Sequence, residues 1–81
     1  NLDNLNIYSN QNDKTIVIAG QLLEATNAKI YDMQGRIVIS TTLSQNTNRQ
    51  QTIDVSNLNT GIYVVQLSNG TQNKTQKVII R

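Results

Sequence analysis

The sequence lacks histidine, cysteine, tryptophan, phenylalanine and proline, and it contains a single methionine. Without cysteine, the chain has no disulfide framework, no thiolate metal site and no thiol nucleophile. Without histidine, it has no side chain whose unperturbed pKa lies near neutrality and no imidazole ligand for a metal. These absences exclude most of the residue combinations that enzymes and metalloproteins use.

Charge of either sign is sparse as well. The 81 residues include seven Lys or Arg and five Asp or Glu, which gives a net charge of +2. Only residues 74–81 are locally basic, and no acidic residue follows Asp54. A nucleic-acid-binding module normally carries a basic stripe interleaved with aromatic side chains. With three tyrosines and no such stripe, the sequence argues against a nucleic-acid partner.

Long apolar runs are missing too. No stretch approaches the roughly 20 apolar residues that span a bilayer, and no signal peptide is visible. The chain starts at Asn1 rather than at a methionine, so we expect it to be an excised C-terminal or internal piece of a longer protein. Its length predicts a single small domain over residues 1–81.

What the sequence does contain is typical of β-structure. Isoleucine, valine, threonine and tyrosine recur in short blocks that are separated by Asn, Gly, Ser and Asp. The blocks predict seven strands, at Leu5–Tyr8, Thr15–Ala19, Ala28–Asp32, Arg36–Thr42, Gln51–Val55, Gly61–Ser68 and Thr75–Ile80. Hairpin links between them predict an all-β, seven-stranded antiparallel β-sandwich of the immunoglobulin-like (Ig-like) type. Only Gln21–Ala25 has a helix-like composition, and its shortness predicts a loop or a ragged strand.

Alternation along the strands predicts which side chains face the core. Ile16 and Ile18 are expected to point inward from one strand, and Ile37 and Ile39 from another. Each tyrosine follows an isoleucine, in the pairs Ile7-Tyr8, Ile30-Tyr31 and Ile62-Tyr63. One member of each pair therefore faces inward and the other outward, and we expect the tyrosines to close the rims of the sandwich, with hydroxyls on water or backbone groups.

Two turns are strongly marked. Asp32-Met33-Gln34-Gly35 lies between apolar runs and predicts a hairpin with a type I turn followed by a glycine bulge. Asn69-Gly70 predicts a second hairpin, for which a two-residue loop sets Val65 opposite Lys74 and a four-residue loop sets Tyr63 opposite Val78. We favour the four-residue loop because it keeps the apolar side chains on one face.

No set of residues predicts catalysis or cofactor binding. The only carboxylates are Asp3, Asp13, Glu24, Asp32 and Asp54. Asp32 and Asp54 fall at strand ends, where Asp stabilises turns, and this interpretation is favoured over the facing carboxylate pair of a glycosidase. The loop Asn10–Asp13 has oxygens for calcium but one formal charge, so a polar hairpin loop explains it better. We expect a domain that is not an enzyme and has no cofactor, metal or small-molecule substrate.

Three segments, read in order, resemble a known family. They are AKIYDMQGRIV at 28–38, IDVSNLNTGIYVV at 53–65 and KVIIR at 77–81. Their order and spacing are similar to those of the C-terminal sorting domains of cargo proteins exported by the type IX (Por) secretion system of Bacteroidetes-type bacteria. The similarity runs from about Leu5 to Arg81. Both prolines of the family's Tyr-Pro-Asn-Pro-like turn are missing at Tyr8–Gln11, which leaves the subtype of the sorting signal open.

The resemblance implies a non-catalytic secretion signal at the end of a larger cargo protein. The cargo would reach the periplasm through an N-terminal signal, and the outer-membrane translocon would recognise the folded domain. A sortase-like peptidase often removes such a domain, here upstream of or near Asn1, and the cargo ends on the outer-membrane surface or in the medium. The alternative is an Ig-like or fibronectin-like accessory module that acts as a spacer or binds glycan.

The sequence also indicates which residues a translocon would contact. Val78 and Ile80 face one way on the last strand, and Lys77, Ile79 and Arg81 face the other. On the preceding strand, Ile62 and Val64 point outward. The predicted recognition residues are Lys77, Val78, Ile79, Ile80, Arg81, Ile62, Val64 and Arg36.

Two arrangements of these strands remain open. In one, an apolar stripe flanked by cations is exposed, and the last strand forms a sheet edge that can pair with a partner strand or a second copy. In the other, both strands are central and covered by loops. The motif residues that the resemblance makes structural are Tyr31, Asp32, Gly35, Gly61 and Tyr63. Gly35 and Gly61 are expected to fix backbone conformation.

Overall fold

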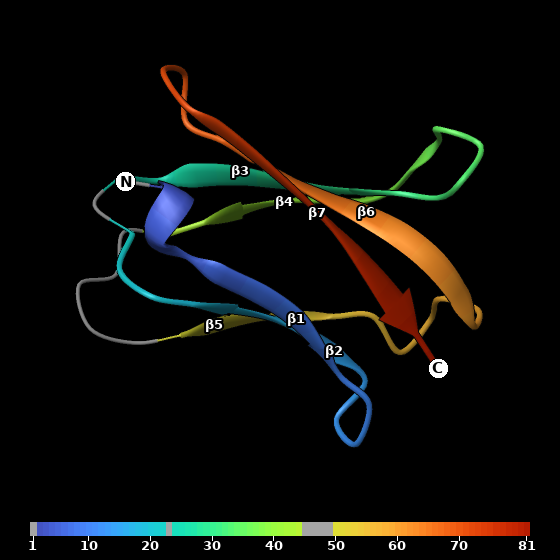
Figure 1. The fold of residues 1–81 in the computed structure, drawn as a ribbon. Helices are drawn as coiled ribbons and strands as arrows, with labels where there is room; N and C mark the ends of the chain where they lie inside the picture. The colour runs from blue at the N-terminus through green and yellow to red at the C-terminus, as the bar shows by residue number, and fades with distance from the viewer. Residues whose placement is uncertain (1, 23, 45–49) are drawn as a thin grey trace.

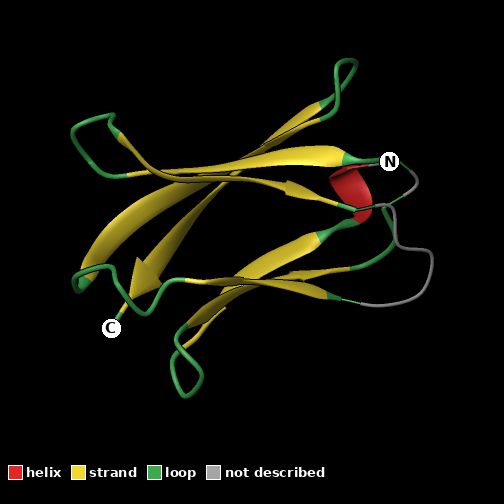
Figure 2. Ribbon diagram, turned by 180° about the vertical axis from the view of Figure 1, so that it is seen from behind, coloured by secondary structure: helices red, strands yellow, loops and turns green. Residues whose placement is uncertain are grey.

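The computed structural model describes residues 2–22, 24–44 and 50–81, which are all-β apart from one short 3-10 helix, η1 (Leu2–Asn4). Their seven strands are β1 (Asn6–Asn10), β2 (Thr15–Ala19), β3 (Thr26–Tyr31), β4 (Ile37–Leu43), β5 (Gln51–Asp54), β6 (Gly61–Ser68) and β7 (Asn73–Ile80). The strands pair antiparallel into two sheets, with orders β1-β2-β5 and β4-β3-β6-β7, which form two layers (Figures 1 and 2). Within the described ranges, no helix is long and apolar enough to cross a bilayer.

The hydrophobic core lies between the two sheets. Along β6, the alternate residues Tyr63, Val65 and Leu67 are buried, and the residues between them are more exposed. Ile16 and Ile18 of β2 face this core from the opposite sheet, as the alternation predicts. Full burial of one such aliphatic side chain contributes about 1.5–3 kcal/mol, so the two sheets stabilise each other mainly through these contacts.

The alternation of β4 is interrupted. Ile39 pairs with Ile30, but Ile37 pairs with Tyr31, so Val38 is an extra residue in β4. Such a β-bulge moves the following side chains to the other face of the strand. The predicted inward position of Ile37 is therefore wrong: Ile37 is 52% exposed, whereas Ile39 packs against the core.

The register of the last hairpin is the one that the four-residue loop predicts. Tyr63 lies opposite Val78, and the pairing of β6 with β7 leaves residues 69–72 as the loop. The side-chain oxygen of Asn69 accepts hydrogen bonds from the backbone N–H groups of Thr71 and Gln72, at 3.2 and 3.0 Å. The Asn69 side chain thus satisfies two backbone donors of the loop, and the register keeps Tyr63 and Val78 on the core side.

The start of β3 differs from the prediction. The strand begins at Thr26 rather than at Ala28, because Thr26 and Asn27 pair with Leu43 and Thr42 of β4. Thr26 is buried, and its hydroxyl donates a hydrogen bond to the backbone oxygen of Glu24 at 3.0 Å. In the preceding segment, which the sequence predicts as a loop or ragged strand, Leu22 is buried in the core. Leu23 of this segment lies outside the described residues.

Candidate functional site

Two isoleucines are exposed side by side on the outer face of the four-stranded sheet. Ile62 of β6 and Ile79 of β7 lie opposite each other in the register and are 41% and 45% exposed. Val78 and Ile80 are each only 5% exposed, because alternate residues of β7 point into the core. Both were in the predicted recognition set, but their side chains are not accessible on the folded domain. They hold β7 on the core.

A continuous row of side chains runs across all four strands next to this pair. In the register, Ile37 of β4 lies opposite Tyr31 of β3, Tyr31 opposite Val64 of β6, and Val64 opposite Lys77 of β7. These residues point outward, since the residues beside them in β3 and β6 are buried. The row lies beside the Ile62–Ile79 pair, and its apolar members extend that pair across the sheet. Five outward-facing apolar or aromatic residues form the outer patch: Tyr31, Ile37, Ile62, Val64 and Ile79.

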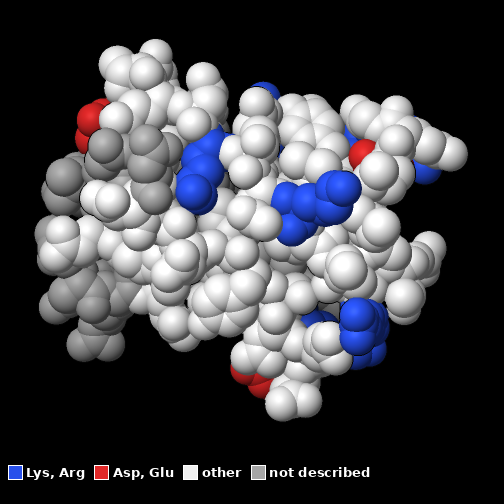
Figure 3. Space-filling view, viewed as in Figure 1, with Lys and Arg blue, Asp and Glu red and all other residues white. Residues whose placement is uncertain are grey.

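Basic side chains accompany the outer patch. Lys77 ends the cross-strand row, and Lys29 of β3 stands opposite Gln66 in the next row along the sheet. Tyr31 donates a hydrogen bond from its hydroxyl to the side-chain oxygen of Gln66 at 3.1 Å, which fixes the ring within the patch. In the view that brings β7 to the front, Lys and Arg atoms lie across the middle and the right of the surface, and the few visible Asp and Glu atoms are far from one another (Figure 3).

The position of β7 decides between the two predicted arrangements. β7 pairs with β6 alone and is the outermost strand of its sheet, whereas β6 is internal. The arrangement with an edge strand and an exposed apolar surface is therefore confirmed for the described residues. The arrangement in which both strands are central and covered is wrong.

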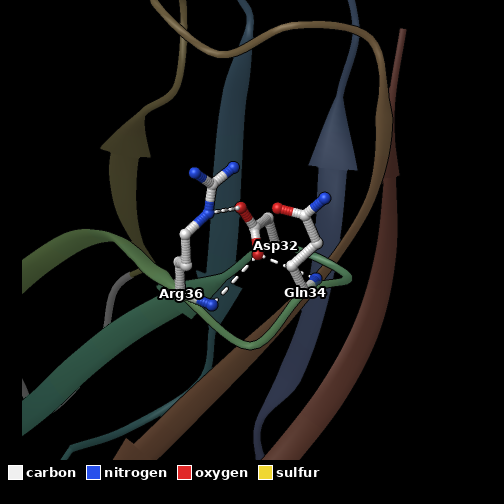
Figure 4. A network of polar contacts seen from close by, with 3 residues as sticks. All are labelled: Asp32, Gln34 and Arg36. Carbon is white, nitrogen blue, oxygen red and sulfur yellow. Dashed lines mark hydrogen bonds and ion pairs between the residues drawn. The ribbon is translucent and has the colours of Figure 1, made fainter.

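Arg36 is hydrogen-bonded to Asp32 within the turn between β3 and β4. The Oδ1 atom of Asp32 accepts the backbone N–H groups of Gln34 and Arg36 at 2.9 and 3.0 Å, and its Oδ2 atom accepts the Nε–H of Arg36 at 2.9 Å (Figure 4). The predicted turn and bulge are confirmed, because Gly35 donates to the Asp32 carbonyl and has a φ of +86°. The Arg36 side chain is still 73% exposed, which leaves the end of its guanidinium open to a partner.

The two strand-end aspartates are both engaged by the turns they initiate. The backbone N–H of Arg36 is the main cause that holds the pKa of Asp32 below its ordinary value, with partial desolvation opposing it. The backbone N–H of Ser56, which donates to Asp54 at 2.9 Å, lowers the pKa of Asp54 in the same way. Asp32 follows β3 and Asp54 ends β5, so they belong to different sheets. Their geometry is that of turn residues.

The glycines of the matched motifs differ in what they do. Gly35 adopts a positive φ, which L-residues rarely do, as the sequence predicts. The prediction for Gly61 is wrong, because its φ is not in the positive range and a Cβ would meet only Tyr63 Cε1, at an ordinary 3.7 Å. Tyr63, two residues on, is buried and donates its hydroxyl to the backbone oxygen of Asn59 at 2.7 Å.

The loop with the calcium-like composition also closes on itself. Asn10 Oδ1 accepts the backbone N–H groups of Asn12 and Asp13 at 3.1 and 3.4 Å, and Asn10 Nδ2 donates to the Asp13 carboxylate at 3.3 Å. Among residues 2–22, 24–44 and 50–81, no three His, Cys, Asp or Glu side chains gather as a metal site would require.

Sequence reasoning missed two members of the outer patch. Tyr31 was predicted to be structural and Ile37 to be internal, yet both face outward beside Val64. The outward position of Tyr31 follows from Ile30 being inward, so that signal was present in the sequence. The adjacency of Tyr31 and Val64 was not, since it depends on β3 pairing with β6, and β4 and β5 lie between these two strands in the chain.

Comparison with known proteins agrees with the resemblance. A family model described as a secretion system C-terminal sorting domain matches residues 3–81. The match supports a sorting domain over an accessory or glycan-binding module. None of the curated proteins compared with the chain matches it.

Proposed function

The chain belongs to the family of secretion-system C-terminal sorting domains, and we propose that it is recognised through the outer patch of its four-stranded sheet. A domain of this family is a C-terminal sorting signal for type IX secretion, which directs export toward the cell surface or the medium and interacts with the secretion machinery. The observation that carries the proposal is the exposed Ile62–Ile79 pair beside Lys77.

The clustering of apolar side chains is what makes the outer patch a recognition surface. Single exposed hydrophobic residues are normal on a soluble protein and need no explanation. Here five apolar or aromatic residues lie in two neighbouring rows of one sheet, and contiguous apolar surface of this kind marks interaction sites. Lys77, Lys29 and Arg36 flank the surface and favour a partner with an apolar centre and acidic margins.

The partner that we propose is the outer-membrane type IX translocon, which would meet the domain during its transit through the periplasm. A sortase-like peptidase would then remove the domain near or upstream of Asn1. In this scheme residues 1–81 are the single sorting domain at the C-terminal end of a larger secreted protein. The domain itself performs no catalysis, in keeping with carboxylates that are committed to turns.

We also propose that the fold is Ig-like. Constant-type Ig domains place strands 1, 2 and 5 in one sheet and strands 3, 6 and 7 in the other. The orders β1-β2-β5 and β3-β6-β7 match this connectivity. The fourth strand differs: it pairs with strand 5 in a constant-type domain, whereas β4 pairs with β3 here. The placement of β4 matters for function because it adds Ile37 to the outer patch.

A reporter experiment tests the proposed function. Residues 1–81 are fused to the C-terminus of a periplasm-targeted fluorescent protein in a bacterium that has type IX secretion. We expect the fluorescence to reach the cell surface or the medium. Reporter that stays in the periplasm with a protease-resistant, folded domain would overturn the proposal.

The structure also dictates which variants are informative. Deletion of residues 77–81 removes Val78 and Ile80 from the core, so lost export would not separate recognition from unfolding. Substitutions on the outward side of the same strand, at Lys77 and Ile79, avoid this difficulty.

A further inference from the structure

The edges of the two sheets meet in a groove that shares only Ile79 with the outer patch. β1 is the outermost strand of one sheet and β7 of the other, and they lie side by side at the front in Figure 1. Between them is an open groove of about 370 Å³. It is lined by Ile7, Tyr8, Ser9, Gln11, Gln76, Lys77, Val78, Ile79 and Arg81.

The backbone groups of β7 that face this groove are paired with no other strand of the described residues, and a strand added here takes the Ile79 carbonyl from the Ser9 hydroxyl of β1. The Ile79 carbonyl accepts the hydroxyl of Ser9 at 2.8 Å, and the Lys77 carbonyl accepts the side-chain amide of Gln76 at 3.1 Å. Both carbonyls therefore point away from β6. The N–H and C=O groups of one residue in an antiparallel strand point to the same side, so the N–H groups of Lys77 and Ile79 face the groove as well. Side chains, not a neighbouring strand, satisfy the two carbonyls.

Among the described residues, the charged side chains that line the groove are of one sign. Lys77 and Arg81 line it, and no Asp or Glu does. Lys77, Ile79 and Arg81 are alternate residues, so their side chains lie on the same, outward face. A strand added alongside β7 would place every second side chain on that face, the first beside Lys77, the next beside Ile79 and the third beside Arg81. The matching strand carries an acidic residue, an apolar residue and another acidic residue at every second position. The remaining side chains of the partner strand would point inward, toward the buried apolar residues Ile7 and Val78.

From this edge we infer that the groove between β1 and β7 binds an extended strand of a partner protein by β-augmentation, with acidic side chains four residues apart on Lys77 and Arg81. The inference rests on the proposed function for the source of that strand, which is the secretion machinery. Backbone pairing supplies the affinity, and the two cations select the strand by its charge.

The inference is tested on the 81-residue chain with capped synthetic peptides. The first peptide has two glutamates four positions apart, with valines between them. In the second, lysines replace the glutamates, and in the third the valine nitrogens are methylated so that they cannot donate hydrogen bonds. Binding is measured by titration, and amide hydrogen exchange by NMR reports the backbone of β7.

We expect the glutamate peptide to bind roughly tenfold more tightly than the lysine peptide, since each exposed ion pair contributes a few-fold. It should also slow the exchange of the Lys77 and Ile79 N–H groups, and the methylated peptide should not. The double variant Lys77→Glu with Arg81→Glu should reverse the preference between the charged peptides. Equal binding of the two charged peptides, or unchanged exchange at Lys77 and Ile79, would overturn the inference.

Two further outcomes have a definite meaning. Protection of the β7 amides that rises with protein concentration, without peptide, would show a second copy on this edge and overturn the assignment to an acidic strand. The peptide measurements involve no export. Their failure therefore overturns the groove assignment alone. Retention of the reporter in the periplasm overturns the sorting function, and with it the secretion machinery as the source of the strand, but not the binding of an acidic strand in the groove.

Discussion

Ile62 and Ile79 face each other across β6 and β7 on the outer side of the sheet, while the residues next to them in sequence point into the core. Directly opposed residues on one face of an antiparallel pair are in contact, and such a pair adds about 0.2–1 kcal/mol relative to alanines. The strands would be equally well anchored to the core with polar residues at these two positions. The exposed pair is thus available for recognition at little cost in stability.

The first prediction compares two adjacent isoleucines of β7. Ile80→Ala should lower the free energy of unfolding by about 2–4 kcal/mol, because it removes buried methyl groups from the core. Ile79→Ala should cost less than about 1 kcal/mol, because its side chain is half in solvent. Urea denaturation of both variants measures the difference. Equal losses would contradict the register of β7.

The second prediction separates the two motif glycines. Gly35→Ala forces an L-residue to a φ of +86° and should cost about 1–2 kcal/mol. Gly61→Ala meets only an ordinary contact with the Tyr63 ring, so we expect a change within about 0.5 kcal/mol. Thermal and urea unfolding of the two proteins provide the comparison. A Gly61 variant as destabilised as the Gly35 variant would refute the backbone assignment.

The third prediction concerns acid. Backbone hydrogen bonds hold the pKa of Asp32 and Asp54 below the ordinary 3.8 in the folded state. Between the folded and the ordinary pKa, the unfolded chain binds more protons, so stability rises with pH in that window. We expect the free energy of unfolding to be nearly constant from neutral pH down to about pH 5 and to fall on further acidification.

Urea denaturation between pH 2 and 7 measures this dependence. The double variant Asp32→Asn with Asp54→Asn is the control, because amides do not titrate and the acid-dependent loss should shrink. An identical acid profile in the double variant would show that other groups are responsible.

The fourth prediction uses the tyrosine hydroxyls. Tyr63→Phe should lower the free energy of unfolding by about 1 kcal/mol, because its buried hydroxyl donates to the Asn59 carbonyl. Tyr8 is 47% exposed, and Tyr8→Phe should change stability by less than about 0.5 kcal/mol. The two variants differ from the parent by one oxygen atom each. A similar effect in both would argue against a structural role for the Tyr63 hydroxyl.

Much of the strand pattern can be predicted from the sequence, because burial of one face of a strand makes apolar residues recur at every second position. The alternation of β6 and β7 predicts that Ile62 and Ile79 face outward and that Tyr63 and Val78 face the core. The same reasoning selects the register of the last hairpin, since the alternative would bring Lys74 opposite Val65. Asp32 and Gly35 predict the hairpin between β3 and β4, because the hydrogen bonds of Asp32 and the positive φ of Gly35 depend on few distant contacts.

Features that depend on how strands pair with one another cannot be predicted in this way. The bulge at Val38 reverses Ile37, yet the segment reads as a regular alternation of isoleucines. The outer patch gains Tyr31 only because β3 inserts between β4 and β6. The groove between β1 and β7 joins the two ends of the chain, and no local motif marks it. The outer patch and the groove depend on contacts that lie far away in sequence, whereas the bulge is local to the β3–β4 hairpin and the alternation of isoleucines gives no sign of it.

The most direct test of recognition through the outer patch is the export of a reporter whose patch has been made polar. The double variant Ile62→Thr with Ile79→Thr keeps β-branched side chains on both strands, and Met33→Thr removes an exposed apolar residue from a hairpin loop outside the patch. Each is fused to the fluorescent protein, and the fraction of fluorescence outside the cell is measured alongside the urea stability of the domain. We predict that the double variant stays folded and is retained in the periplasm, while the Met33 variant is exported like the parent. Export of the folded double variant at the parental level would contradict the account.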